Sequence, residues 1–110
     1  MSALFTPITL GDYQLPNRIF MAPLTRARAG SDGVPSALMA EYYAQRASAG
    51  LIISEATAVS KRGLGWVNAT GNFTDEQHAG WRMNGDAVHE KGGRHSQQLW
   101  HTGRSVNPDL

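Results

Sequence analysis

The sequence contains no cysteine, no long apolar run and no excess of charge of one sign. Without cysteine the chain has no disulfide framework, no thiolate metal site and no cysteine nucleophile. The longest apolar run, residues 51–53, is far too short to cross a membrane, and the first residues lack the basic segment of a signal peptide. A net charge of +1 with no cluster of basic residues does not indicate nucleic-acid binding. We therefore expect a cytoplasmic protein that binds neither a membrane nor nucleic acid.

The composition is that of a folded domain, but the chain is short. Of its 110 residues 41% are hydrophobic and 17% are charged, a balance unlike that of a disordered tail. This length allows one small domain with a modest core. A complete eight-stranded α/β barrel needs about 250 residues, so the chain is too short to form one alone.

Strand patterns recur along the chain. Residues 8–15 predict a β-hairpin, because alternating apolar positions flank a Gly11-Asp12 turn. Three further runs predict the strands of a sheet, and the first two are apolar enough to be buried on both faces. These runs are residues 18–22, 51–54 and 95–100.

Two helices are expected between these strands. The first begins near Pro35-Ser36 and ends before Gly50, a residue suited to the end of a helix. Its apolar side chains form a stripe for packing on a sheet: Leu38, Tyr42 and Ala49, with Met39, Tyr43 and Ala47 beside them. The second helix covers residues 74–91, and Thr74 with Gln77 matches a capping box at its start. Its weak apolar stripe and internal glycines indicate that it depends on docking.

The order of elements predicts a hairpin followed by a parallel β-α-β-α-β unit of the α/β class. Three parallel strands leave two open edges and exposed apolar surface, so such a unit is marginal by itself. We expect another polypeptide or segment to complete the sheet.

Common catalytic motifs are weak or missing. Gly63-Leu64-Gly65 begins like a dinucleotide loop, but no third glycine follows and no Walker A loop exists. Ser54 does not lie in a nucleophile elbow. His95 and His101 would share a face of a strand, which leaves a metal site as a minor alternative.

Polar groups gather where the three predicted strands end. They are Thr25 after the first strand, Glu55, Ala56 and Thr57 after the second, and Gln98, Trp100 and His101 at the end of the third. Ligands of parallel α/β folds bind at the carboxyl ends of strands. Amide, hydroxyl and backbone groups in this position suit a planar heterocycle with several hydrogen-bonding atoms.

Three stretches at these same positions resemble the Old Yellow Enzyme family of FMN-dependent ene-reductases. They are NRIFMAPLTRAR (residues 17–28), LMAEYYAQRASAGLIISEAT (residues 38–57) and QLWHTGR (residues 98–104). These stretches look like the bacterial members of the family that are similar to N-ethylmaleimide and pentaerythritol tetranitrate reductases. The resemblance implies a (β/α)₈ TIM barrel with a hairpin closing its bottom, of which residues 1–110 are the N-terminal part.

The same resemblance implies a role for particular residues. Pro23, Leu24 and Thr25 would contact FMN, and the Thr25 hydroxyl would donate a hydrogen bond to flavin O4 as a catalytic group that favours the reduced flavin. The Ala56 N–H would lie at the same edge, and the Gln98 amide would serve O2 and N3–H of the pyrimidine ring. Trp66, where close relatives have tyrosine, and Trp100 would line the substrate pocket. The proton donor and the phosphate loops of the family belong to later strands.

The predicted function is that of an ene-reductase, to which this chain contributes part of the FMN site. NAD(P)H would reduce the flavin, and the flavin would reduce the C=C bond of an activated alkene such as an enone, maleimide or nitroalkene. We expect the chain alone neither to bind FMN tightly nor to turn over substrate. One alternative is a truncated half-barrel acting as an interaction module. A weaker one is a metal hydrolase that uses His95 and His101.

Overall fold

The strands and helices form in the order that the sequence predicts. The computed structural model describes residues 2–109. A short 3₁₀ turn, Ala3–Phe5, precedes the hairpin, and a second one, Lys61–Gly63, follows the central strand. The remaining elements are β1 (Ile8–Leu10), β2 (Tyr13–Leu15), β3 (Phe20–Met21), α1 (Ala37–Ala44), β4 (Leu51–Ala58), α2 (Asp75–Glu90) and β5 (His95–Trp100).

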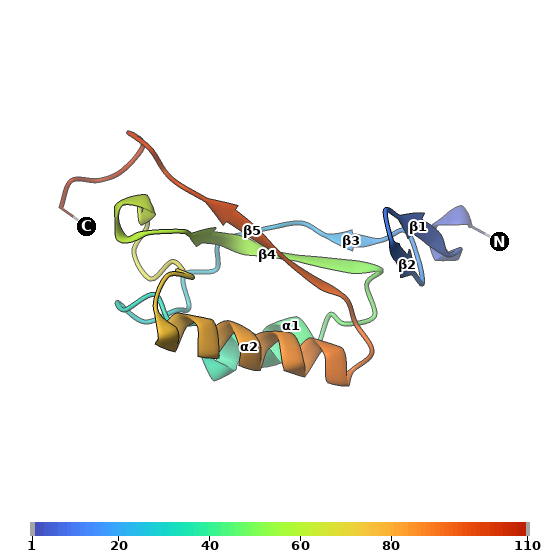
Figure 1. Cartoon of the computed structure of the whole chain (residues 1–110). Helices are drawn as coiled ribbons and strands as arrows, with labels where there is room; N and C mark the ends of the chain where they lie inside the picture. Colours follow the sequence, from blue (N-terminus) through green and yellow to red (C-terminus); the bar gives the residue numbers. More distant parts are fainter. Residues whose placement is uncertain (1, 110) are drawn as a thin grey trace.

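The hairpin is confirmed, and it lies beyond one end of the main sheet. β1 and β2 are antiparallel, with Ile8 opposite Leu15 and Leu10 opposite Tyr13. Gly11 has φ +57°, a backbone conformation that the turn requires and that glycine adopts without steric cost. The hairpin lies near the amino ends of β4 and β5, away from their arrowheads (Figure 1).

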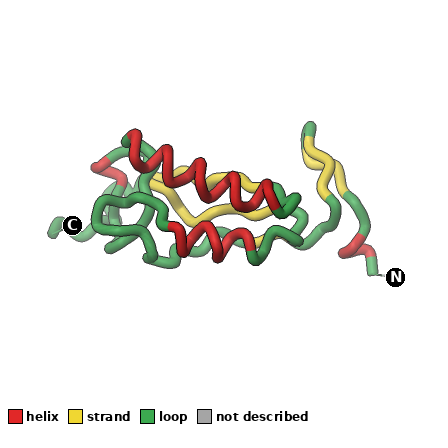
Figure 2. Tube along the Cα trace, turned by 90° about the horizontal axis from the view of Figure 1, so that it is seen from below, coloured by secondary structure: helices red, strands yellow, loops and turns green. Residues whose placement is uncertain are grey.

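The main sheet is parallel and has helices on one face only. The strand order is β3-β4-β5, and both neighbouring pairs are parallel. α1 and α2 lie side by side beneath the strands, and the view from below shows both helices in front of the sheet (Figures 1 and 2). The opposite face carries no layer within residues 2–109; we call it the open face.

The first two strands of the main sheet, predicted at residues 18–22 and 51–54, differ in length from the prediction. β3 contains only Phe20 and Met21 instead of residues 18–22, and Phe20 is 39% exposed rather than buried. Met21 packs against the core between helices and sheet, so Phe20 alternates to the open face, which has no covering layer within residues 2–109. β4 extends to Ala58, so Glu55, Ala56 and Thr57 lie inside the strand and not after it.

α1 begins as predicted but buries a different face. The Ser36 side chain accepts a hydrogen bond from the Met39 N–H at the helix start. The helix ends at Ala44, earlier than expected, and turns continue the chain towards Gly50. Leu38 is 60% exposed, because the face in contact with the sheet and α2 is formed by Met39 and Tyr43.

α2 starts with the predicted capping box and is docked by buried side chains. The Thr74 hydroxyl accepts from the Gln77 N–H, and the Gln77 side chain accepts from the Thr74 N–H. The Gln77 amide also donates to the Asp32 carbonyl at 2.9 Å, which ties the helix to the preceding loop. The core between helices and sheet contains Ala29, Met39, Tyr43, Ala47, Ile52, Trp81 and Val88. Neither helix described in residues 2–109 has the length and apolarity of a membrane span.

Candidate functional site

Ala56 and Gln98, from neighbouring strands, lie opposite each other near the carboxyl edge of the sheet. They are register partners of β4 and β5. From Ile53 to Ala56 the chain of β4 advances by three residues, whereas its partner β5 advances by only two, from Ser96 to Gln98. The additional residue in β4 forms a β-bulge. Ile52 packs in the core, and strict alternation would turn Ala56 the same way. The bulge instead places Ala56 with Gln98 on the open face.

The backbone of Ala56 is directed towards the edge of β4 that faces the segment after β3. Ala58 bonds through both its N–H and its carbonyl to residues 70–72 on this edge, whereas Val59 donates to Trp100 of β5. Alternate residues of a strand direct their backbone groups to the same side. The Ala56 N–H therefore points away from β5, and the pairing of β3 with β4 ends earlier, at Met21 and Ile52.

The segment that contains Thr25 runs beside the same part of β4. Arg26 lies close enough to Glu55 for its backbone N–H and its charge to act on the Glu55 carboxyl group. Thr25 precedes Arg26, and Ala56 follows Glu55, so the two predicted contacts come from adjacent stretches of backbone. Thr25 and Leu24 are exposed, whereas Pro23 is half-buried. No hydrogen bond to the Thr25 hydroxyl is made within residues 2–109.

Trp66 and Trp100, the two tryptophans predicted to line the substrate pocket, belong to the same end of the sheet. Trp100 ends β5, and its Nε1 is buried without a hydrogen-bond partner in the described part of the chain. Trp66 is 59% exposed in the loop after β4. That loop packs against the segment after β5, where the Thr102 N–H and hydroxyl both donate to the Gly63 carbonyl.

The groups at this edge suit a flat ring with several polar atoms. Thr25 offers a hydroxyl, Ala56 a backbone N–H and Gln98 an amide that both donates and accepts. The Gln98 side chain is exposed and makes no hydrogen bond within residues 2–109. The orphaned Trp100 Nε1 adds a donor that the described chain leaves unused. This donor set fits the pyrimidine edge and the neighbouring carbonyl of an isoalloxazine ring.

Glu55 and Tyr43 form a buried pair that sequence reasoning did not connect. The Tyr43 hydroxyl donates to Glu55 Oε2 at 2.8 Å and accepts from the Glu55 N–H at 3.0 Å. Burial raises the pKa of the Glu55 carboxyl, while the Tyr43 hydroxyl and Arg26 act in the opposite direction. Burial also raises the pKa of Tyr43, so its hydroxyl keeps its proton. A glutamate in an apolar run and a tyrosine on an apolar helix stripe were the only signals in the sequence.

His95 lies on the helix-facing side of β5, where it packs against aromatic rings. Its ring lies 5.6 Å from that of Tyr43 and 5.8 Å from that of Trp81, measured between centroids. His101 accepts a hydrogen bond from the Gly103 N–H. Residues 2–109 contain no group of three or more histidine, aspartate or glutamate side chains placed to hold a metal ion. The metal alternative therefore has no support in the described chain.

The burial of His95 predicts that acid destabilises the fold. Burial and the charge of His89 lower the pKa of His95, so the folded protein binds this proton less readily than the unfolded chain. The free energy of unfolding should fall as the pH drops below about 6.5, the ordinary histidine value, and level off below the folded pKa. His95→Phe keeps an aromatic ring and should remove this part of the pH dependence. Urea denaturation at pH 7.5, 6.5 and 5.5 measures the effect.

His78→Gln is the control, because His78 is exposed on α2. It should leave the difference between pH 7.5 and 5.5 as in the wild type. Equal acid sensitivity of the wild type and His95→Phe would contradict the assignment.

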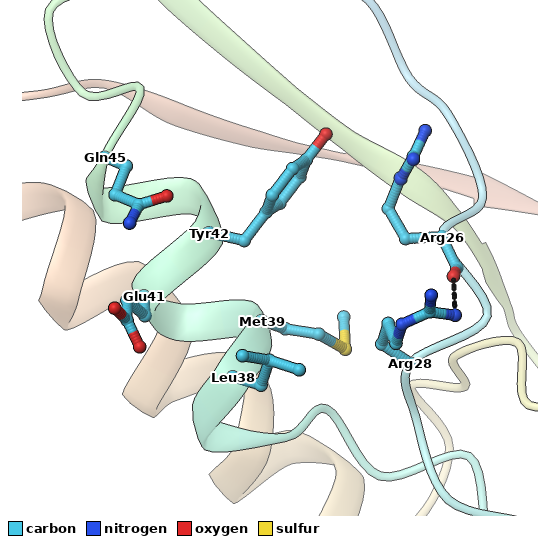
Figure 3. A pocket seen from close by; sticks show the side chains of 7 residues that line it. All are labelled: Arg26, Arg28, Leu38, Met39, Glu41, Tyr42 and Gln45. Atoms are coloured by element: carbon cyan, nitrogen blue, oxygen red, sulfur yellow. Dashed lines mark hydrogen bonds between the residues drawn. The ribbon is translucent and has the colours of Figure 1, made fainter.

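A separate pocket lies on the outer side of the fold. It has a volume of about 280 Å³ and is bounded by α1 and by Arg26 and Arg28 (Figure 3). The Tyr42 ring lines it and stacks under the Arg46 guanidinium, 3.9 Å from ring centroid to Cζ. We call Thr25, Ala56 and Gln98 the polar edge of the sheet. The pocket is a different site, because neither Ala56 nor Gln98 lines it.

A parallel sheet with helices on one face, a hairpin at its amino end and polar groups at its carboxyl edge is the beginning of an α/β barrel with a ligand site at its mouth. The model of the NADH:flavin oxidoreductase / NADH oxidase family matches residues 3–110, and the chain belongs to this family. The resemblance to Old Yellow Enzymes is thereby confirmed.

Solved structures of relatives agree closely with this fold. The Old Yellow Enzyme homologue from Zymomonas mobilis is 57% identical with a TM-score of 0.93, over 96% of this chain and 30% of that one. Morphinone reductase, solved with tetrahydroNAD, is 54% identical with a TM-score of 0.93, over 99% of this chain and 31% of that one. Among curated proteins, the chanoclavine-I aldehyde reductase of Penicillium roqueforti is 50% identical over 100% of this chain and 30% of its own length. The chain thus spans about 30% of the length of these relatives.

Proposed function

We propose that this chain forms one flank of the FMN site of an NAD(P)H-dependent ene-reductase. The observation that carries the proposal is the pairing of Ala56 with Gln98 on the open face of the sheet. A module that only packs against a partner needs no unpaired amide and backbone donor at this edge. Membership of the flavin oxidoreductase family supports the same cofactor.

Each polar group has a distinct task in this proposal. The Thr25 hydroxyl would donate to flavin O4, where negative charge grows on reduction, and this favours the reduced state. The Ala56 N–H would support the same edge, and the Gln98 amide would bond O2 and N3–H. Pro23 and Leu24 would give apolar contacts, and Trp66 and Trp100 would bound the substrate space. When bound, FMN supplies hydride transfer from NAD(P)H to an alkene activated by a carbonyl or nitro group.

The proposal requires a further segment or polypeptide that completes the barrel. β3 and β5 are both open edges of the described sheet, and its open face is uncovered. Leu24, Leu99 and Phe20 are exposed apolar side chains of these strands or of the segments that continue them. Closure of the barrel would pair both edges and bring further elements over these side chains. The groups that bind the FMN phosphate and protonate the substrate would come from the completing part.

Flavin binding by the completed barrel tests the proposal. The purified protein should be yellow and should bleach with NADPH under nitrogen, as followed by visible absorbance. Gln98→Ala should raise the Kd of FMN about tenfold, because a hydrogen bond of about 1 to 1.5 kcal/mol is lost. Titration of flavin fluorescence gives this constant.

Gln97→Ala is the matched control, since the same change is made one residue away on the other face of β5. Gln97 accepts a hydrogen bond from the Asn72 amide and does not belong to the polar edge. Its FMN affinity should equal that of the wild type. A colourless completed protein would refute the proposal and favour the interaction module. Equal affinity of Gln98→Ala and the wild type would remove Gln98 from the site.

A further inference from the structure

The bulge in β4 leaves a backbone group that the sheet cannot satisfy. The extra residue of a bulge has no partner on the neighbouring strand, and a buried N–H without an acceptor is costly. The bulge lies between Ile53 and Ala56, and the Glu55 N–H falls within it. The Tyr43 hydroxyl, from α1, accepts this N–H at 3.0 Å. The helix therefore supplies the acceptor that β5 does not.

The same hydroxyl also holds the Glu55 side chain. It donates to Glu55 Oε2 at 2.8 Å, and both residues are 1% exposed. One hydroxyl thus binds the main chain and the side chain of a single residue, which fixes the backbone of the bulge in two directions. Because Glu55 is turned to the helices, the following residue, Ala56, is turned to the open face beside Gln98.

The Glu55 carboxyl also lies near the segment after β3 that contains Thr25 and Arg26. Its Oε1 is buried and has no hydrogen bond of normal geometry within residues 2–109. The nearby Arg26 backbone and guanidinium act on this carboxyl. Arg26 follows Thr25 directly, so the carboxyl lies between the two stretches of backbone that carry Thr25 and Ala56.

We propose that Tyr43 is a positioning residue for the flavin: by holding Glu55 in the β4 bulge, its hydroxyl sets the direction of the Ala56 N–H and the pairing of Ala56 with Gln98. This inference rests on the proposed function and extends it to a residue on the far side of the sheet. Tyr43 itself faces the helix layer, among Trp81 and His95, and both hydrogen bonds that its hydroxyl makes within residues 2–109 are with Glu55.

The test compares Tyr43→Phe with Tyr42→Phe in the completed barrel. Phenylalanine at position 43 keeps the ring packing and removes only the hydroxyl. Tyr42 is the adjacent tyrosine, and its hydroxyl makes no hydrogen bond within residues 2–109, so the same change there is the control (Figure 3). Amide chemical shifts of Ala56 and Gln98, recorded without cofactor, report the bulge. The Kd and the absorption maximum of bound FMN report the site.

Tyr43→Phe should shift both amides, raise the Kd of FMN about tenfold and move the flavin band, whereas Tyr42→Phe should match the wild type. Glu55→Gln, with Tyr43 left intact, should behave nearly as the wild type, because the amide oxygen still accepts from the Tyr43 hydroxyl. Unchanged amide shifts in a folded Tyr43→Phe protein would overturn the inference, as would shifted amides with an unchanged Kd and spectrum. A wild type that binds no FMN would instead overturn the proposed function, and the amide shifts would still decide whether Tyr43 holds the bulge.

Discussion

Replacing Gly50 with alanine is expected to lower the free energy of unfolding by about 3 kcal/mol or more, at the upper end of the cost of overpacking. Gly50 is buried where the chain enters β4, and its N–H donates to the Ile19 carbonyl at 2.8 Å. An added Cβ would overlap the carbonyl group of Asn17. Asn17 is itself fixed, because its side chain bonds the Ser48 carbonyl and the Ile19 N–H. Relief of the overlap would separate β3 from β4.

Gly85→Ala is the matched control for this experiment. Gly85 lies inside α2, and the nearest atom to an added Cβ is His95 Nδ1 at 3.8 Å, an ordinary contact. Alanine there should raise the stability by about 1 kcal/mol through its helix propensity. Urea denaturation followed by far-ultraviolet circular dichroism measures both variants. A Gly50→Ala protein as stable as the wild type would show that the approach of Asn17 is not required.

Trp81→Ala is expected to cost about 3 to 5 kcal/mol, as truncation of a buried aromatic residue usually does. Trp81 is 5% exposed and joins the two helices to β5 through ring contacts with Tyr43 and His95. Its Nε1–H donates to the Gly71 carbonyl at 3.1 Å, so the segment that leads into α2 would also lose a partner. The loss of stability is measured by urea denaturation with the same dichroism signal.

Trp66→Ala provides the comparison, because it removes the same side chain from an exposed loop. Its effect on stability should stay within about 0.5 kcal/mol. Trp81→Phe should fall between the two, since the ring is kept and one hydrogen bond is lost. If the alanine variants at positions 66 and 81 were equally stable, the packing assigned to Trp81 would be wrong.

The order of strands and helices was predictable because local signals mark it. The Gly11-Asp12 turn, Ser36 at the start of α1 and the Thr74 capping box each act over a few residues, and each is found where it was predicted. Their effect depends on backbone conformation and short-range hydrogen bonds, and these are determined by a few neighbouring residues.

The bulge and the buried pair were not predictable from local pattern. Residues 51–58 give no sign of which face each side chain takes, because small and polar residues follow the apolar run. The position of Glu55 depends on a tyrosine twelve residues earlier, on another element. Likewise, Leu38 and Met39 are both apolar, and the contacts of α1 with α2 and the sheet decide that Met39 is buried and Leu38 exposed.

The predicted placement of the site at the carboxyl edge came from a rule about parallel sheets together with the family resemblance. The structure brings Ala56 and Gln98 together and places the backbone beside Thr25 near them. The individual roles of Pro23, Leu24, Thr25, Trp66 and Trp100 are predictions from the family resemblance, because each is defined by a contact with the proposed ligand.

The alternation of β5 divides its side chains between two surfaces. His95 and Gln97 face the helix side, whereas Ser96, Gln98 and Trp100 share the other face. Ser96 and Gln98 are exposed, so a mutation at either leaves the helix contacts intact and has little effect on the stability of the fold. Sequence change on the open face of β5 is thus separable from the packing that forms the fold.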